Sequence, residues 1–166
     1  MKIASFEAAT LAIPEDDPLA NMPEEEGRTR PVVTLRLRTD DGIEGIGITF
    51  YGGKMTGALR AAVEELAALT VGEDPFRIER ILGKLRAAAD STGPAGLFTL
   101  ALSAIDIALW DIKGKALNTP LWRLLGGHRD RVPTYASGSL RRGLTDDQAR
   151  RAASILVQKG FTQMKT

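Results

Sequence analysis

A small set of hydroxyl-bearing and cationic side chains could bind a polar ligand. Tyr51 and Lys54 flank a Gly52-Gly53 step, and glycine lets a backbone approach a ligand closely. A phenol and an ammonium group can donate hydrogen bonds to hydroxyl or carboxylate groups. Arg28 and Arg30 can do the same from a polar stretch nearby. For each residue alone, a surface loop with scattered charge explains the pattern equally well.

Two further polar residues stand at the ends of predicted strands. Ser137 follows a short apolar segment at 132–136, and Lys165 ends a second one at 161–165. A serine hydroxyl at a strand end can bind a carboxylate, or it can satisfy backbone groups of its own loop. Lys165 can equally be an ordinary strand residue whose stem lies along apolar surface.

The sequence offers few metal ligands. It has no cysteine and one histidine, His128, which we expect at the surface of a linker. Two acidic runs, at 15–17 and 24–26, lie in a polar stretch and are typical of solvated charge. We therefore assign no residue of this chain as a metal ligand.

Bulk properties exclude several classes of protein. The 166 residues suffice for a hydrophobic core, and the net charge of +1 gives no reason to expect a nucleic acid partner. The N-terminus lacks the pattern of a signal peptide. The longest apolar segment carries Asp and Lys, which disfavours a membrane span. We expect a soluble cytoplasmic protein.

The elements that must position these residues begin with three strands. The segments 3–13, 32–37 and 43–50 alternate in polarity. Asp40-Asp41-Gly42 lies between the last two, and Asp-Gly between alternating segments is a strong hairpin signal. These features predict an antiparallel meander, after which the pattern becomes helical.

Three helical segments follow. Apolar residues at helical spacing predict a helix over 55–69 and a second one capped by Asp74, with Pro75 at its first position. The third, from Leu97, is apolar on every side, so we expect it to be buried all round. Asp111 and Lys115 lie four apart and can pair along it. Asn118-Thr119-Pro120 ends it, and a short helix closes at Gly126-Gly127.

The pattern changes after residue 127. A strand at 132–136 precedes a helix that opens on a Thr145–Gln148 capping box and ends at Lys159-Gly160. A strand at 161–165 follows. Strand, helix and strand within about 35 residues form a βαβ unit with parallel pairing. The chain therefore divides into an α+β part, residues 1–126, and the start of a parallel α/β structure, residues 127–166.

The segment 97–127, LFTLALSAIDIALWDIKGKALNTPLWRLLGG, carries a resemblance. Its pattern AxSAIDxALWDxxGKxxxxPLWxLLGG resembles the signature at the domain junction of the mandelate racemase/muconate lactonizing group of the enolase superfamily. The resemblance implies an α+β capping domain over 1–126, followed by the first strand, helix and second strand of an incomplete (β/α) barrel. Asp106, Asp111 and Lys115 would then be structural partners, not catalysts.

The resemblance also implies chemistry. Members of the group remove a proton next to a carboxylate and stabilise the enediolate on Mg²⁺. Ser137 matches a carboxylate-binding serine. Lys165 matches the first lysine of a Lys-any-Lys pair, which helps hold the carboxylate, and it is the catalytic candidate of this chain. The second lysine of the pair, a proton-transferring base, would fall outside these 166 residues. The loops holding Tyr51, Lys54 and Arg28 would contact substrate. The acidic Mg²⁺ ligands of the group come from three later barrel strands, so we expect Mg²⁺ in the complete enzyme and none on this chain alone.

Three functions stay open. The hairpin, the Tyr-Gly-Gly loop and the Val-Pro-Thr-Tyr-Ala-Ser segment look most like the acid-sugar dehydratase branch, whose reaction removes an α-proton and then a β-hydroxyl. A racemase or cycloisomerase of the same superfamily is the alternative. A third is a non-catalytic fragment that acts through self-association, because an unfinished parallel sheet leaves an open edge. We expect a homo-oligomer and no membrane partner.

Overall fold

The computed structural model describes residues 1–14, 29–50, 54–93, 95–140 and 143–165. The chain forms two compact units, which we call unit 1 (residues 1–13 and 30–128) and unit 2 (residues 14–29 and 129–166). In chain order the elements are β1 (Ile3–Pro14), β2 (Thr29–Thr39), β3 (Glu44–Thr49), α1 (Thr56–Ala68), α2 (Ile78–Ala88), the 3-10 turn η1 (Asp90–Thr92), α3 (Leu97–Ala116), α4 (Leu121–Leu124) and α5 (Asp146–Gln158).

The three strands form an antiparallel sheet in the order β1-β2-β3, as predicted. β2 and β3 are joined by the predicted hairpin, with Val33 opposite Thr49 and Arg38 opposite Glu44. Gly42 takes a φ of 88° in the turn, a conformation that suits glycine. The polar stretch that carries the acidic runs at 15–17 and 24–26 lies outside the described residues.

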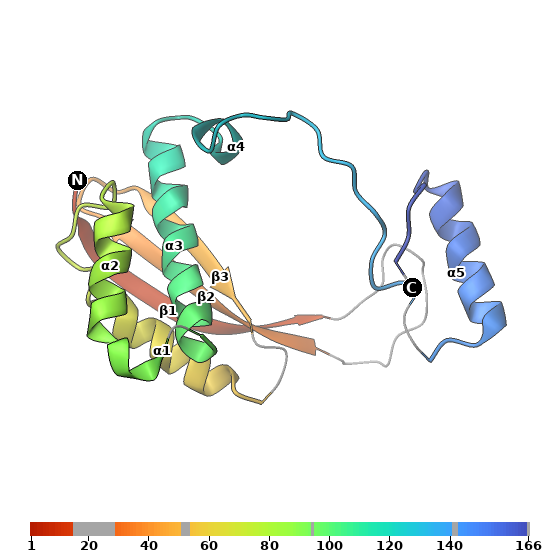
Figure 1. Ribbon diagram of the computed structural model, residues 1–166, viewed down its shortest axis with the longest axis horizontal. Helices are drawn as coiled ribbons and strands as arrows, with labels where there is room; N and C mark the ends of the chain where they lie inside the picture. The colour runs from red at the N-terminus through yellow and green to blue at the C-terminus, as the bar shows by residue number, and fades with distance from the viewer. Residues whose placement is uncertain (15–28, 51–53, 94, 141–142, 166) are drawn as a thin grey trace. The chain divides into compact units, whose positions relative to one another are not determined.

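The helices of unit 1 cover one face of this sheet (Figure 1). α3 packs on β3 and also contacts α1 and α2. Alternate residues of β2 point toward the helices, and Val33, Leu35 and Leu37 are fully buried there. This core holds unit 1 together through apolar burial at roughly 25 cal/mol per Å².

The apolar composition of α3 predicts that the helix is buried on every side. In the structure, one side of α3 is exposed. Its buried residues face β3, α1 and α2, whereas Thr99 is exposed and Ile107 is 40% exposed. Ser103 and Trp110, on the same side, are partly exposed. The prediction was wrong because apolar residues occur all round the helix, whereas the elements that pack against it in unit 1 cover only part of its circumference.

The start of α2 also differs from the prediction. The helix begins at Ile78 with Arg77 as its N-cap. Asp74 instead accepts a hydrogen bond from the Phe76 backbone N–H at 2.9 Å, and its carbonyl accepts from Arg77 N at 3.0 Å. Asp74 and Pro75 thus form a separate turn before the helix, because an aspartate can satisfy a turn locally as well as cap a helix.

In unit 2, α5 begins at the predicted capping box. The Thr145 hydroxyl accepts from Gln148 N at 3.3 Å, and the Gln148 side chain accepts from Thr145 N at 2.9 Å. The two predicted strands beside it shrink to one parallel bridge between Ala136 and Met164. The direction of pairing is the predicted one. A parallel sheet needs both faces covered, and among the described residues of unit 2 only α5 accompanies these two segments.

No described helix is long and apolar enough to span a membrane.

Candidate functional site

The parallel bridge of unit 2 brings the two strand-end candidates together. Ala136 N donates to Gln163 O at 3.0 Å, and Lys165 N donates to Ala136 O at 2.9 Å. These bonds align the end of one segment with the end of the other, so Ser137 and Lys165 emerge at the same end of the pair. Residues separated by the whole of α5 are therefore neighbours across one bridge.

Ser137 and Lys165 also share a side of the bridge. Successive side chains of extended segments point to opposite sides. Ala136 is buried, with 2% of its surface exposed, and its partner Met164 is partly buried. Ser137 and Lys165 each follow by one residue, and both are exposed. A hydroxyl and an ammonium group on one accessible side can bind a carboxylate, because both donate hydrogen bonds to its oxygens.

The backbone around Ser137 is sharply turned. Gly138 has a φ of 98°, in the region that favours glycine. Ser139, two residues after Ser137, is 3% exposed. The chain therefore turns at Gly138, and the buried Ser139 follows directly after the exposed Ser137.

The loop candidates are placed only in part. Lys54 is exposed and lies just before α1. It belongs to unit 1, and Ser137 and Lys165 belong to unit 2. Tyr51 and Arg28 lie outside the described residues, as do the acidic runs at 15–17 and 24–26.

Magnesium does not fit the described residues. Among them there is no group of three or more His, Asp or Glu side chains that could hold a metal ion. Mg²⁺ needs near-octahedral oxygen ligands, and the exposed Ser137–Lys165 pair offers a cation and a single hydroxyl.

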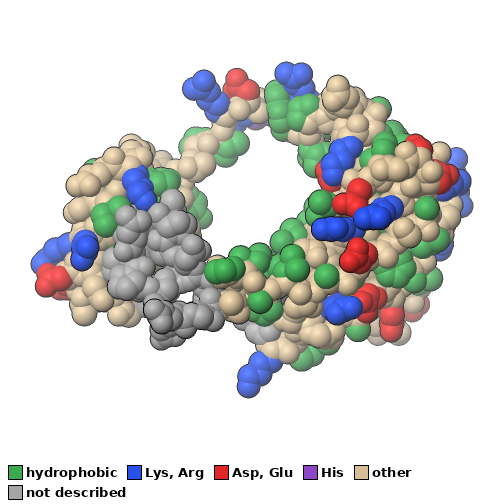
Figure 2. All heavy atoms as spheres, turned by 180° about the vertical axis from the view of Figure 1, so that it is seen from behind, with side chains coloured by type: hydrophobic (Ala, Val, Ile, Leu, Met, Phe, Trp, Pro, Cys, Tyr) green, Lys and Arg blue, Asp and Glu red, His purple; other side chains and the backbone are tan. Residues whose placement is uncertain are grey.

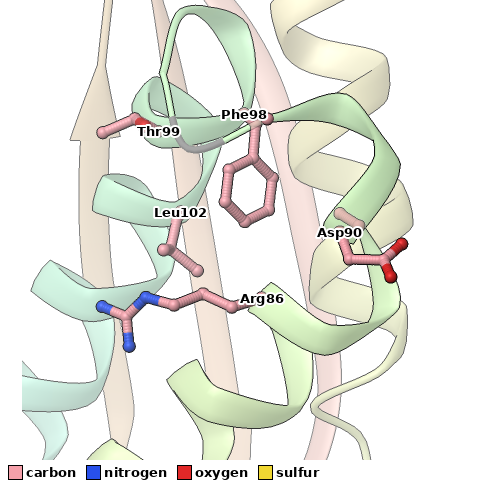
Figure 3. A pocket seen from close by; sticks show the side chains of 7 residues that line it. Arg86, Asp90, Phe98, Thr99 and Leu102 are labelled. Atoms are coloured by element: carbon pink, nitrogen blue, oxygen red, sulfur yellow. The ribbon is translucent and has the colours of Figure 1, made fainter.

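A pocket of about 320 Å³ lies elsewhere, in unit 1, between the end of α2 and the start of α3. Phe98 and Leu102 of α3 face the stem of Arg86 from α2, while the Asp90 carboxylate points away from them (Figure 3). The sequence patterns did not predict this pocket. Periodicity along one helix does not reveal it, because its lining comes from two helices and the turn between them.

One carboxyl on the same helix pair has a perturbed pKa. Burial raises the pKa of Asp106, and the nearby Glu79 charge raises it further. Arg86 and a hydrogen bond from Trp110 act in the opposite direction. Asp106 lies one helix turn before Trp110 on α3, so this environment is a property of helix packing within unit 1.

A sequence model of the family "Mandelate racemase / muconate lactonizing enzyme, N-terminal domain" matches residues 10–126. The chain belongs to this family. The family match contains the whole of α3 and the hairpin, so the resemblance carried by the 97–127 segment is confirmed.

Curated proteins of the mandelate racemase/muconate lactonizing enzyme family resemble this chain. The L-talarate/galactarate dehydratase of Salmonella typhimurium is 40% identical over 114 residues, 66% of this chain and 29% of that protein. The D-galactonate dehydratase of Xanthomonas axonopodis is 47% identical over 102 residues, which cover 61% of this chain and 26% of that protein. A 3,6-anhydro-alpha-L-galactonate cycloisomerase of Streptomyces coelicolor is 38% identical over 108 residues, which cover 64% of this chain and 30% of that protein. The chain spans between a quarter and a third of the length of these relatives.

Solved structures of the family share the fold. A racemase from Streptomyces coelicolor with bound magnesium superposes with a TM-score of 0.84 at 30% identity, covering 98% of this chain and 45% of that one. The Salmonella typhimurium dehydratase, liganded with Mg and L-lyxarohydroxamate, superposes with a TM-score of 0.79 at 30% identity. The match covers 96% of this chain and 41% of that one. The expected capping-domain fold, followed by the start of a barrel, is confirmed.

Proposed function

We propose that this chain is the N-terminal part of an enzyme that dehydrates an acid sugar. The observation that carries the proposal is the Ser137–Lys165 pair, a hydroxyl and a cation held at one end of a parallel bridge. It supplies donors for a carboxylate, the group common to acid sugars. Two of the relatives compared above are named as dehydratases of such compounds.

In this proposal, residues 1–126 form the capping domain and residues 127–166 start the barrel. Ser137 and Lys165 bind the substrate carboxylate from the barrel side. A positive charge beside the carboxylate makes the neighbouring C–H more acidic, because it stabilises the charge that develops when the proton leaves. A base from outside the described residues takes that α-proton. The β-hydroxyl then leaves as water once an acid has protonated it, and the resulting enol becomes the keto acid. Lys54, Tyr51 and Arg28 are further substrate-binding candidates in this proposal, a role that rests on the sequence alone.

Magnesium belongs to the same proposal only as a cofactor of the larger enzyme. The Salmonella typhimurium structure is described with Mg, and the described residues of this chain do not form a site for it. Its ligands would come from residues beyond those described. We further propose a cytoplasmic homo-oligomer, which the mass of the purified enzyme in solution would test.

A chimera tests the function. This chain replaces the matching N-terminal part of the Salmonella typhimurium dehydratase, and galactarate dehydration is followed by formation of the keto product. We expect an active chimera in which Lys165→Met lowers kcat/KM by roughly a hundredfold or more and Ser137→Ala mainly raises KM. A folded chimera that processes no acid sugar would contradict the proposal.

The same experiment separates the alternatives. The similarity to a cycloisomerase favours isomerisation as the second candidate. In D₂O, a racemase or cycloisomerase would exchange or move the α-proton without losing water, whereas a dehydratase yields the keto product. If Lys165→Met and Ser137→Ala both leave the rates of the chimera unchanged, the pair is structural, and the chain contributes only assembly.

A further inference from the structure

β3 is an edge strand of the sheet of unit 1, with β2 on one side only. Ile46 sits opposite Arg36, and its N–H points away from β2. An edge with such outward backbone groups can accept a strand from another chain. The exposed side chains of Ile46 and Ile48, each 45% exposed, make this edge apolar and rich in β-branched residues. Seen from behind, unit 1 carries green hydrophobic side chains among charged ones (Figure 2).

Two side chains of α3 meet this edge. Asp111 Oδ2 accepts a hydrogen bond from Ile46 N at 2.8 Å, and Lys115 Nζ donates one to Glu44 O at 2.7 Å. Asp111 Oδ2 and Lys115 Nζ are themselves 2.7 Å apart. The ion pair therefore binds the two backbone groups that flank Gly45.

This arrangement has the pattern of a parallel strand. In a parallel ladder, one residue donates its N–H to the residue before its partner and accepts from the residue after it. Here Lys115 supplies the donor to Glu44, and Asp111 supplies the acceptor to Ile46. The ion pair thus stands where a single peptide residue of an added strand would pair around Gly45.

Close packing holds the two elements at this distance. A Cβ on Gly45 would lie 2.2 Å from the carbonyl oxygen of Ala108, and one on Gly47 would lie 1.8 Å from that of Ala104. Only glycine at both positions lets the β3 backbone approach α3 closely enough for these short hydrogen bonds. The contact is built by the strand and the helix together.

We propose that Asp111 and Lys115 act as an intramolecular plug: they occupy the parallel-strand site at the β3 edge and keep a second copy of this chain from pairing there. The second copy is the occupant because it brings the same apolar, β-branched edge segment, and like edges are suited to pair. The role is independent of any catalytic function of the chain.

Amide hydrogen exchange tests the plug in the 166-residue chain. In Asp111→Ala, we expect exchange at the Ile46 amide to accelerate roughly 10- to 100-fold, because this amide loses its hydrogen bond to a charged group. The matched control is Glu64→Ala, which breaks the exposed Arg60–Glu64 pair of the same spacing on α1. It should leave the Ile46 amide unchanged. An Ile46 amide that stays as protected in Asp111→Ala as in the wild type overturns the proposal.

The molar mass in solution tests the consequence. Asp111→Ala and Lys115→Met should associate at concentrations about tenfold or more below those of the wild type and of Glu64→Ala. Lys115→Arg keeps a donor and should restore the wild-type behaviour. Lys115→Met keeps the apolar stem of the side chain. It therefore tests the proposal by itself if Asp111→Ala does not fold. Variants whose Ile46 amide is exposed but whose molar mass stays that of the wild type would refute the plug.

Discussion

At the scale of single residues, position in the fold decides what each charged group does. Asp111 and Lys115 lie four apart, and their pairing was predicted from spacing alone and is confirmed. That both also bind the β3 backbone could not be predicted, because spacing along one helix says nothing about which strand lies beside it. Ser137 and Lys165, as site residues, stay a prediction.

The pKa of Asp106 leads to a test by pH. Because burial raises this pKa, the folded chain keeps the proton at pH values where the unfolded chain has lost it. The contribution of Asp106 to stability therefore falls as the pH rises from its ordinary value of 3.8 through the folded pKa. We expect Asp106→Asn to raise the Tm at neutral pH and to lose this advantage below pH 3.8.

The neighbouring charge provides the control for that experiment. Glu79 is the second cause that raises the pKa of Asp106. Glu79→Gln should give part of the same gain in Tm at neutral pH, since it removes the repulsion but not the burial. Equal Tm values for wild type and Asp106→Asn across the whole pH range would show that the raised pKa has no effect on folding.

At the scale of elements, most of unit 1 could be predicted, because periodicity reports which face of a strand or helix is apolar. The strands, α1, α3 and the capping box of α5 are where the sequence patterns placed them. Two details were wrong, each for its own reason. α2 starts later because Asp74 satisfies a turn of its own, and α3 has an exposed side because neighbouring elements do not cover it.

The approach of β3 to α3 gives a prediction of its own. In Gly47→Ala the added Cβ meets the backbone of Ala104, which cannot move aside as a flexible side chain would. We expect a loss of about 3 kcal/mol in the free energy of unfolding, at the upper end for overpacking, measured by urea denaturation.

A second glycine serves as the matched control. Gly83 lies in α2 with nothing within 4 Å of an added Cβ. Gly83→Ala should therefore stabilise the chain by roughly 0.5–1 kcal/mol, since alanine favours a helix over glycine. If both substitutions change stability by the same amount, the close contact between β3 and α3 is not what glycine serves at position 47.

At the scale of the whole molecule, the chain covers one end of a much longer family pattern. It matches the family's N-terminal domain over residues 10–126, and it spans 29% of the Salmonella typhimurium dehydratase. Within the described residues, no group of three or more His, Asp or Glu side chains could hold a metal ion. The role of Ser137 and Lys165 in binding a carboxylate stays a prediction.

Magnesium titration tests whether this chain binds the ion by itself. Isothermal titration of the 166-residue chain with Mg²⁺ should reveal no site of micromolar affinity, because the described residues offer no acidic group of the size that this ion needs. Tight binding of one ion per chain would instead mean that the acidic runs at 15–17 and 24–26 supply ligands. Substituting either run would then abolish the binding.

Family membership, the element types and the signature at 97–127 follow from the sequence by itself, because they depend on local periodicity and on the order of residue types. Tertiary structure alone decided that Ser137 and Lys165 meet across one bridge. It also decided that the Asp111–Lys115 pair closes the β3 edge. Both contacts join residues far apart in the chain, and only packing determines which distant backbone a side chain reaches.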